Sequence, residues 1–102
     1  MTKVTFFKDG EDFRGFELSG HSGYAGSGED IVCAAVSSAA YLTANDCELF
    51  GIKADVTVSD GYMKLYAAKS DDLNRLADGF YRHMLQLEEQ YKKHIRVFVS
   101  EV

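Results

Sequence analysis

The sequence predicts a two-layer α/β fold in which two helices cover one face of a mostly antiparallel sheet. Three observations support this fold class. Two segments are long and regular enough to be helices, a pair of strands joined by a tight turn precedes each of them, and a β-branched segment follows the second. The predicted order is therefore β-β-α-β-β-α-β. At 102 residues and 46% hydrophobic content, residues 1–102 are expected to form a single domain with its own core.

The first predicted hairpin occupies the N-terminal end of the sequence. Residues 4–8 are β-branched or aromatic, residues 9–12 hold a turn with glycine, and residues 13–19 form the returning strand. Gly15 within the second strand is typical of a β-bulge. His21 therefore follows directly after the end of a strand.

The first helix is predicted over residues 31–49, with Asp30 as its N-cap. Cys33 would then be the third residue of the helix, where backbone N–H groups are unpaired and the helix dipole is positive. A thiol in that position becomes a thiolate more readily. The N–H groups of this first turn, that of Cys33 included, could also hold an oxyanion. The first half of the helix is rich in Ala and Ser, which favours close packing and could leave room for a peptide beside Cys33.

The second half of the chain repeats the pattern. Residues 53–59 and 62–68 are joined by Asp-Gly, the strongest short hairpin signal in the sequence. Ser70 is expected to cap a second helix, and residues 95–100 to form the last strand. Gly79, inside this helix, is expected at a close crossing with the first helix. The helix carries apolar residues at three- and four-residue steps that predict a core-facing stripe: Leu73, Leu76, Ala77, Phe80, Met84, Leu87 and Tyr91.

Composition and charge exclude several classes of protein. Eleven basic and sixteen acidic residues give a net charge of −5, which argues against nucleic-acid binding and agrees with a basic partner. No apolar run is long enough for a transmembrane helix, and the first residues do not resemble a signal peptide, so a cytoplasmic protein without membrane contact is expected. Cys33 and Cys47 lie fourteen positions apart on one predicted helix, about 21 Å, which is too far for a disulfide. Their spacing is not that of a metal site, and neither a metal nor a cofactor is expected.

The candidate functional site is the stretch from residue 19 to residue 38. Cys33 provides a nucleophile and His21, twelve residues earlier, a base, with a glycine-rich loop between them that could fold the base back onto the sulfur. The loop that would contact a substrate contains Gly20, Gly23, Tyr24, Gly26 and Gly28. A cysteine in a helix is more often a buried core residue. From the residues alone, a reactive thiol and a packed thiol are equally good interpretations.

The segments Gly20-His21, Gly23-Tyr24-Ala25 and Gly28-Glu29-Asp30-Ile31-Val32-Cys33-Ala34-Ala35-Val36-Ser37 resemble the signature of the bacterial ribosomal-processing cysteine proteases. The resemblance spans most of the chain. It implies an endopeptidase, needed for ribosome assembly, that removes a short N-terminal extension from large-subunit ribosomal protein twenty-seven by cutting after a phenylalanine. It also implies a homodimer.

The same resemblance implies roles for individual residues. Cys33 corresponds to the nucleophile and His21 to the general acid and base, while Asp30 and Ser37 occupy supporting positions. Asp30 would orient His21 or cap the helix, and capping is the local default. Ser37, one turn after Cys33, would hydrogen-bond the thiolate or, more commonly for a helical serine, a backbone carbonyl. Ser22 departs from the family pattern, which often has alanine there.

Two other functions fit the sequence. A non-enzymatic module could use its acidic surface to bind a basic ribosomal partner, with Cys33 as a packed thiol. A redox-sensing protein could use the same activated thiol without any peptidase action. Substitution of Cys33 and His21 separates these alternatives from the protease.

Overall fold

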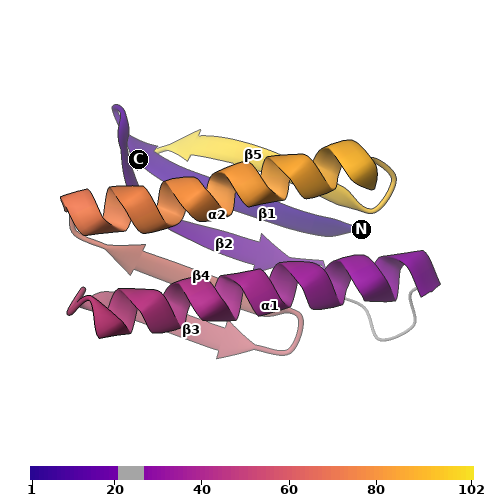
Figure 1. Cartoon of the computed structure of the whole chain (residues 1–102), viewed down its shortest axis with the longest axis horizontal. Coiled ribbons are helices and arrows are strands. Elements are labelled where there is room, and N and C mark those ends of the chain that lie inside the picture. The colour runs from indigo at the N-terminus through magenta and orange to yellow at the C-terminus, as the bar shows by residue number, and fades with distance from the viewer. Residues whose placement is uncertain (21–26) are drawn as a thin grey trace.

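The computed structural model describes residues 1–20 and 27–102, and for residues 27–30 the backbone alone. The elements confirm the predicted order β-β-α-β-β-α-β (Figure 1). They are β1 (Thr2–Asp9), β2 (Asp12–Ser19), α1 (Ser27–Leu49), β3 (Ala54–Ser59), β4 (Tyr62–Ala67), α2 (Asp71–Gln90) and β5 (Ile95–Glu101).

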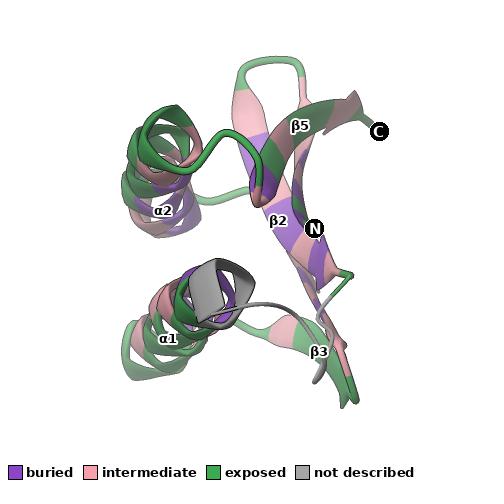
Figure 2. Ribbon diagram, turned by 90° about the vertical axis from the view of Figure 1, so that its right-hand side faces the viewer, coloured by how far each residue is buried: buried purple, intermediate pink, exposed green. Residues whose placement is uncertain are grey.

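The five strands form one sheet in the order β3-β4-β2-β1-β5. All neighbouring strands are antiparallel except β1 and β5, which run parallel. Both helices lie on the same side of this sheet, so the molecule has the two predicted layers (Figure 2). β3 and β5 are the two edge strands, and α1 and α2 lie side by side above the sheet.

The predicted bulge in β2 is confirmed. The register between β1 and β2 shifts between Phe7 and Lys8, which pair with Gly15 and Phe13, so Arg14 is the additional residue. Gly15 also packs directly on β4. A Cβ at this position would overlap the carbonyl oxygen of Leu65, so the close approach of the two strands requires glycine.

The core lies between the helices and the covered face of the sheet. The Phe80 ring of α2 packs against Phe6 and Phe16, with centroids 5.3 and 4.7 Å away. Ser70 is the N-cap of α2 as predicted, since its side chain accepts a hydrogen bond from the Leu73 N–H at 3.0 Å. The predicted stripe is buried at Leu73, Ala77, Phe80 and Met84. It does not extend to Tyr91, which is the exposed C-cap of the helix.

The predicted start of the first helix is wrong. α1 begins at Ser27, four residues before residue 31, and Asp30 is its fourth residue rather than its N-cap. Acidic residues stabilise the whole first turn of a helix through the dipole, so an aspartate there does not by itself identify the cap. The shift changes the place of Cys33 in the helix.

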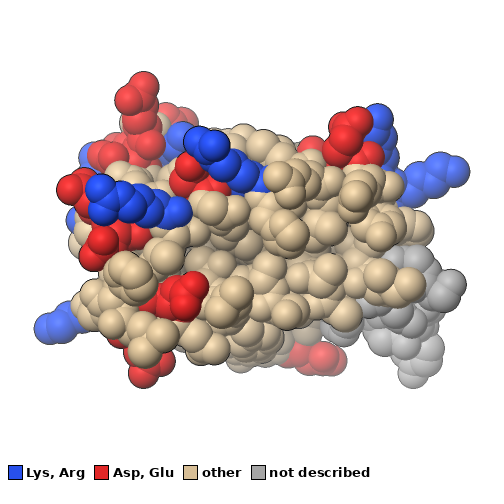
Figure 3. Space-filling view, viewed as in Figure 1, with Lys and Arg blue, Asp and Glu red and all other residues tan. Residues whose placement is uncertain are grey.

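The expected close helix crossing at Gly79 is also wrong. A Cβ at Gly79 would meet nothing within 4 Å, because Gly79 lines an open groove of about 560 Å³ between α1 and α2. This side of the molecule carries its charged residues mainly toward one end and the upper edge, and much of its centre is uncharged (Figure 3). Among the residues that the structure describes, no helix is long and apolar enough to cross a membrane.

Candidate active site

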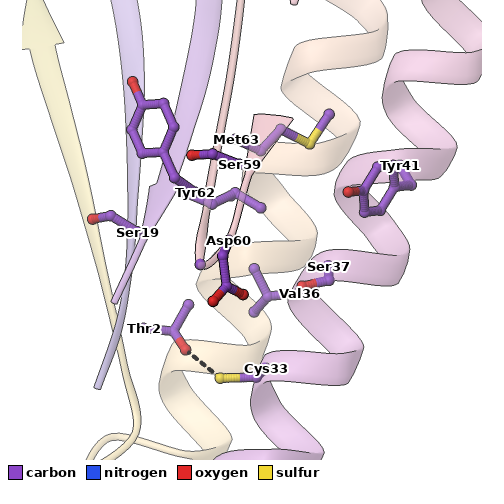
Figure 4. Close-up of a pocket in the computed structure, with 12 residues that line it drawn as sticks. Thr2, Ser19, Cys33, Val36, Ser37, Tyr41, Ser59, Asp60, Tyr62 and Met63 are labelled. Carbon is purple, nitrogen blue, oxygen red and sulfur yellow. Dashed lines mark hydrogen bonds between the residues drawn. The ribbon is translucent and has the colours of Figure 1, made fainter. Parts of the chain in front are cut away.

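Cys33 faces the sheet from the N-terminal half of α1 and is only 2% exposed. Its side chain lines a cavity of about 240 Å³. The start of β1, the end of β2, α1 and the turn between β3 and β4 enclose this cavity, and Figure 4 shows the residues that line it. The sulfur is therefore shielded from bulk water but adjoins a space that a small group can enter.

Cys33 is the seventh residue of α1, so its predicted place in the first turn is wrong. At 1.5 Å per residue it lies about 9 Å from the start of the helix. The helix dipole acts mainly within the first turn, and only the first four N–H groups lack a partner in the helix. The helix start therefore contributes little to activating the sulfur, and the N–H of Cys33 is not one of the donors free to hold an oxyanion.

The sulfur has a nearer polar partner in Thr2. The Thr2 Oγ1 atom lies 3.0 Å from Cys33 Sγ, in a buried hydrogen bond between residues 31 positions apart (Figure 4). Sequence reasoning missed Thr2. The available signal was its alternation with Val4 and Phe6, which places a hydroxyl on the core-facing side of β1.

Ser37 lines the cavity one turn after Cys33, which confirms that the two residues share a face of α1. In the described part of the chain, the hydrogen-bond partner of the sulfur is Thr2 rather than Ser37. Asp60, in the turn between β3 and β4, was also missed by sequence reasoning. Its carboxylate is directed into the cavity toward the end that holds Cys33 (Figure 4).

Tyr62, two residues after Asp60, is also among the residues that line the cavity. Its phenol donates a hydrogen bond of 2.6 Å to a carboxylate oxygen of Glu17. This hydrogen bond is the main reason that the pKa of Tyr62 is raised, with smaller contributions from burial and from the charge of Glu17. Tyr62 therefore stays a neutral phenol at physiological pH.

The remaining predicted site residues lie at or beyond the edge of the described segments. His21, Gly23, Tyr24 and Gly26 fall outside the described residues. Gly28 and Asp30 are placed as backbone in the first turn of α1, where Asp30 is not the N-cap. The other role considered for Asp30, orienting His21, concerns side-chain atoms outside the described part. Gly20 is described, and it lies against Met1 at the start of β1, next to Thr2.

Neither cysteine forms a disulfide, as predicted, and Cys47 is buried in the core. Burial raises the pKa of the Cys47 thiol, and the charge of Asp46 raises it further. Within residues 1–20 and 27–102, no group of three or more His, Cys, Asp or Glu side chains is arranged to hold a metal ion. Cys47 also lines a cavity, of about 350 Å³, but burial and the Asp46 charge disfavour its thiolate.

A cysteine at the wall of a cavity, in a sequence that carries a histidine twelve residues earlier, supplies two of the residue types that thiol-dependent hydrolases use. The sequence model of the family described as cysteine protease Prp matches residues 1–96, and the chain belongs to this family. No curated protein matches the chain.

Solved structures share the fold over almost their whole length. The crystal structure of SMU.848 from Streptococcus mutans is 25% identical with a TM-score of 0.85, covering 100% of this chain and 96% of that one. The ribosomal processing protease Prp from S. aureus with a covalently linked product peptide is 21% identical with a TM-score of 0.86, covering 98% of this chain and 100% of that one. The same S. aureus protease with a substrate peptide is 20% identical, with the same TM-score and coverage. The two S. aureus comparisons show a common fold.

Proposed function

We propose that this chain is a sequence-specific cysteine endopeptidase that removes a short N-terminal extension from a ribosomal protein, by cutting after a phenylalanine, and so serves ribosome assembly. The observation that carries the proposal is the sulfur of Cys33 at the wall of a cavity, in a member of the cysteine protease Prp family. The S. aureus relative is described as an essential ribosomal processing protease. A ribosomal substrate would place the enzyme in the cytoplasm.

The cavity beside Cys33 suits an aromatic side chain. Its volume of about 240 Å³ has room for one such ring, and its walls include Leu18, Val36, Tyr41 and Met63. Burial of an aromatic ring against such walls supplies much of the binding energy of a peptide. This supports cleavage after phenylalanine, with the scissile carbonyl of the substrate next to the sulfur.

A second cavity of about 350 Å³ adjoins the first, since Tyr41 and Met63 line both. It runs between α1 and the edge strand β3, where Val56 and Val58 are half exposed. An extended peptide can pair with an edge strand through its backbone while its side chains occupy adjoining hollows. Two adjoining cavities beside an edge strand therefore favour a peptide substrate over a small molecule.

The proposed reaction is acyl transfer in two steps. The thiolate of Cys33 attacks the carbonyl carbon after the substrate phenylalanine, a C–S bond forms, and the C–N bond breaks as protonated His21 gives its proton to the leaving amine. Water then attacks the thioester, with neutral His21 accepting its proton. The C–S bond breaks, the substrate leaves as a carboxylic acid, and the thiolate and protonated His21 are restored.

The position of β2 supports the role of His21. Ser19, the last residue of β2, lines the cavity together with Cys33, and His21 is two residues further along the chain. In the proposed enzyme the substrate contacts the loop made of Gly20, Gly23, Tyr24, Gly26 and Gly28. Asp30 and Ser37 support the dyad from α1.

The proposed partners are a basic ribosomal protein and a second copy of the chain. The net charge of −5 and the Asp60 carboxylate at the cavity favour a basic substrate. The homodimer is supported by the edge strand β5, where Phe98 and Val99 are about half exposed. Sedimentation of wild type and Val99→Lys tests it, with the dimer expected only in the wild type.

The proposed activity is tested with a ribosomal protein that carries its N-terminal extension, incubated with wild type, Cys33→Ser, His21→Ala and, as a matched control, Cys47→Ser. Mass spectrometry is expected to find a single cut after phenylalanine with wild type and Cys47→Ser. Cys33→Ser is expected to bind the protein without cutting it, and His21→Ala to fold without cutting it.

The two alternative functions give different results. A binding module predicts no cut by any variant and unchanged binding by Cys33→Ser. A redox sensor predicts no cut and a reversible oxidation of Cys33 that persists in His21→Ala. The match to a protease family favours the endopeptidase over both.

A further inference from the structure

We propose that Thr2 is a positioning residue for Cys33: its hydroxyl group fixes the direction of the sulfur and donates a hydrogen bond to the thiolate. The inference rests on the proposed function, in which Cys33 is the nucleophile. It assigns to the first strand a role that sequence reasoning had given to the start of the helix.

The contact is short and well enclosed. The Thr2 Oγ1 atom lies 3.0 Å from Cys33 Sγ, and the two residues are 5% and 2% exposed. A hydrogen bond that is shielded from water is electrostatically stronger than one on the surface. Both side chains line the same cavity, so the bond lies where a substrate would meet the sulfur (Figure 4).

The backbone holds Thr2 in place independently of Cys33. The Thr2 N–H donates to the carbonyl oxygen of His94 at 2.9 Å, and Thr2 pairs with Ile95 in the parallel ladder between β1 and β5. Threonine is β-branched, so few side-chain rotamers are open to it in a buried strand. The hydroxyl is therefore a fixed partner that limits the directions in which the sulfur can point.

The hydrogen bond depends on the charge of the sulfur. With a neutral thiol, either the S–H or the O–H group can donate, and the bond is weak. With a thiolate only the Thr2 hydroxyl can donate, and a hydrogen bond to a charged group is stronger. Thr2 thus favours the charged state of Cys33, which the helix dipole, acting mainly within the first turn, supports little. The Asp60 carboxylate, directed toward the same end of the cavity from the turn between β3 and β4 (Figure 4), opposes that charge and is the same in all Thr2 variants.

This mechanism predicts opposite effects at low and high pH. Removal of the hydroxyl would take away a donor that only the thiolate requires, and so would disfavour the charged form of the sulfur. The thiolate that remains would be about threefold more nucleophilic, because reactivity rises when the negative charge is less stabilised. The reaction rate of Cys33 would then fall about threefold at neutral pH and rise about threefold once the sulfur is fully ionised.

The experiment measures the alkylation rate of Cys33 by iodoacetamide in the full chain from pH 5.5 to 10.5, by mass spectrometry of the peptide that contains it. Thr2→Val replaces the hydroxyl with a methyl of similar shape. Its rate profile is expected to lie below that of wild type at neutral pH and to cross above it at high pH. Thr2→Ser, which keeps the hydroxyl, is expected to give a rate profile that does not cross that of wild type. A Thr2→Val profile that superimposes on wild type, or lies below it by a constant factor at all pH values, overturns the proposal.

A second pair of variants covers the case in which Thr2→Val does not fold. Thr2→Ser and Thr2→Ala both lack the methyl group and differ by one hydroxyl, so the crossing must appear between these two profiles.

Alkylation requires no peptide, so its result is independent of cleavage. If wild type cuts no ribosomal protein, the endopeptidase proposal fails while the rate profiles still decide the role of Thr2. If wild type cuts, Thr2→Val is expected to lower kcat about threefold at neutral pH with KM unchanged.

Discussion

Gly20, directly after β2, lies against the carbonyl group of Met1 at the start of β1. A Cβ at position 20 would overlap the Met1 carbonyl oxygen and would stand 3.8 Å from the Thr2 Cα atom. The φ angle of Gly20 is +90°, which side-chain-bearing residues rarely adopt. Gly20 therefore lets the chain pass directly beside Met1 and Thr2, the residue whose hydroxyl contacts Cys33.

Substitution of Gly20 should disturb the site through β1. Gly20→Ala is expected to lower the free energy of unfolding by about 2 kcal/mol or more, from backbone strain and from the overlap with Met1. It should also slow alkylation of Cys33 at neutral pH by displacing Thr2. Urea unfolding and alkylation rates measure both effects. Gly10→Ala is the control, since Gly10 has a φ of +64° but no atom near its Cβ position. An equal decrease in the free energy of unfolding of the two variants would show that the overlap with Met1 has no effect.

Gly79 is a position at which the protein can be stabilised. Its Cβ position is open and its φ angle is not positive, so Gly79→Ala should raise the free energy of unfolding by about 1 kcal/mol through helix propensity alone. Gly15→Ala should do the opposite, since its Cβ would overlap the Leu65 carbonyl oxygen. Thermal unfolding of both variants tests the pair, and a destabilised Gly79→Ala would contradict the open groove between the helices.

Cys47 should remain unreactive under conditions in which Cys33 is alkylated. Burial and the Asp46 carboxylate raise the pKa of Cys47 above its ordinary value of 9.0, so its thiolate fraction is reduced at any pH below that value. Iodoacetamide at pH 8 is expected to modify Cys33 first and Cys47 only after unfolding. Asp46→Asn removes the weaker of the two causes and should increase Cys47 labelling slightly. Faster labelling of Cys47 than of Cys33 in the folded chain would be inconsistent with an activated Cys33.

The same shift affects stability at alkaline pH. A raised pKa in the folded state means that folding favours the neutral thiol of Cys47, so its contribution to stability is fully present below pH 9.0 and is lost as the pH rises through the folded-state value. The free energy of unfolding should therefore decline above pH 9.0 by less in Cys47→Ala than in wild type. Parallel pH profiles of the two proteins would contradict this prediction.

Asp60 should determine the preference for basic substrates. Its carboxylate is directed into the cavity that holds Cys33, so Asp60→Asn is expected to raise KM for a peptide with a basic residue near the cut by roughly two- to fivefold, with little change in kcat. The effect should shrink at high salt. Asp55→Asn is a control with the same change in net charge, because Asp55 lies on β3 between Ala54 and Val56 and faces the other side of the sheet. A similar change in KM for both variants would indicate a general charge effect.

The sequence by itself determined the order of the elements, the bulge at Gly15, the cap at Ser70 and the buried stripe of α2. These features depend on interactions between residues close in the chain, so they can be predicted from the local sequence pattern. The start of α1 was misjudged because acidic residues favour every position of a first turn, so Asp30 does not identify the cap.

Only the tertiary structure decided what surrounds Cys33. Thr2 is 31 positions away, and the two side chains meet because the start of β1 lies near the N-terminal half of α1 (Figure 1). Asp60 enters the same cavity because the turn between β3 and β4 lies at the same end of the sheet as the last residues of β2. Strand order, and with it the neighbours of a buried sulfur, results from packing between distant segments. That packing depends on shape and burial across the whole domain, which no local run of residues encodes.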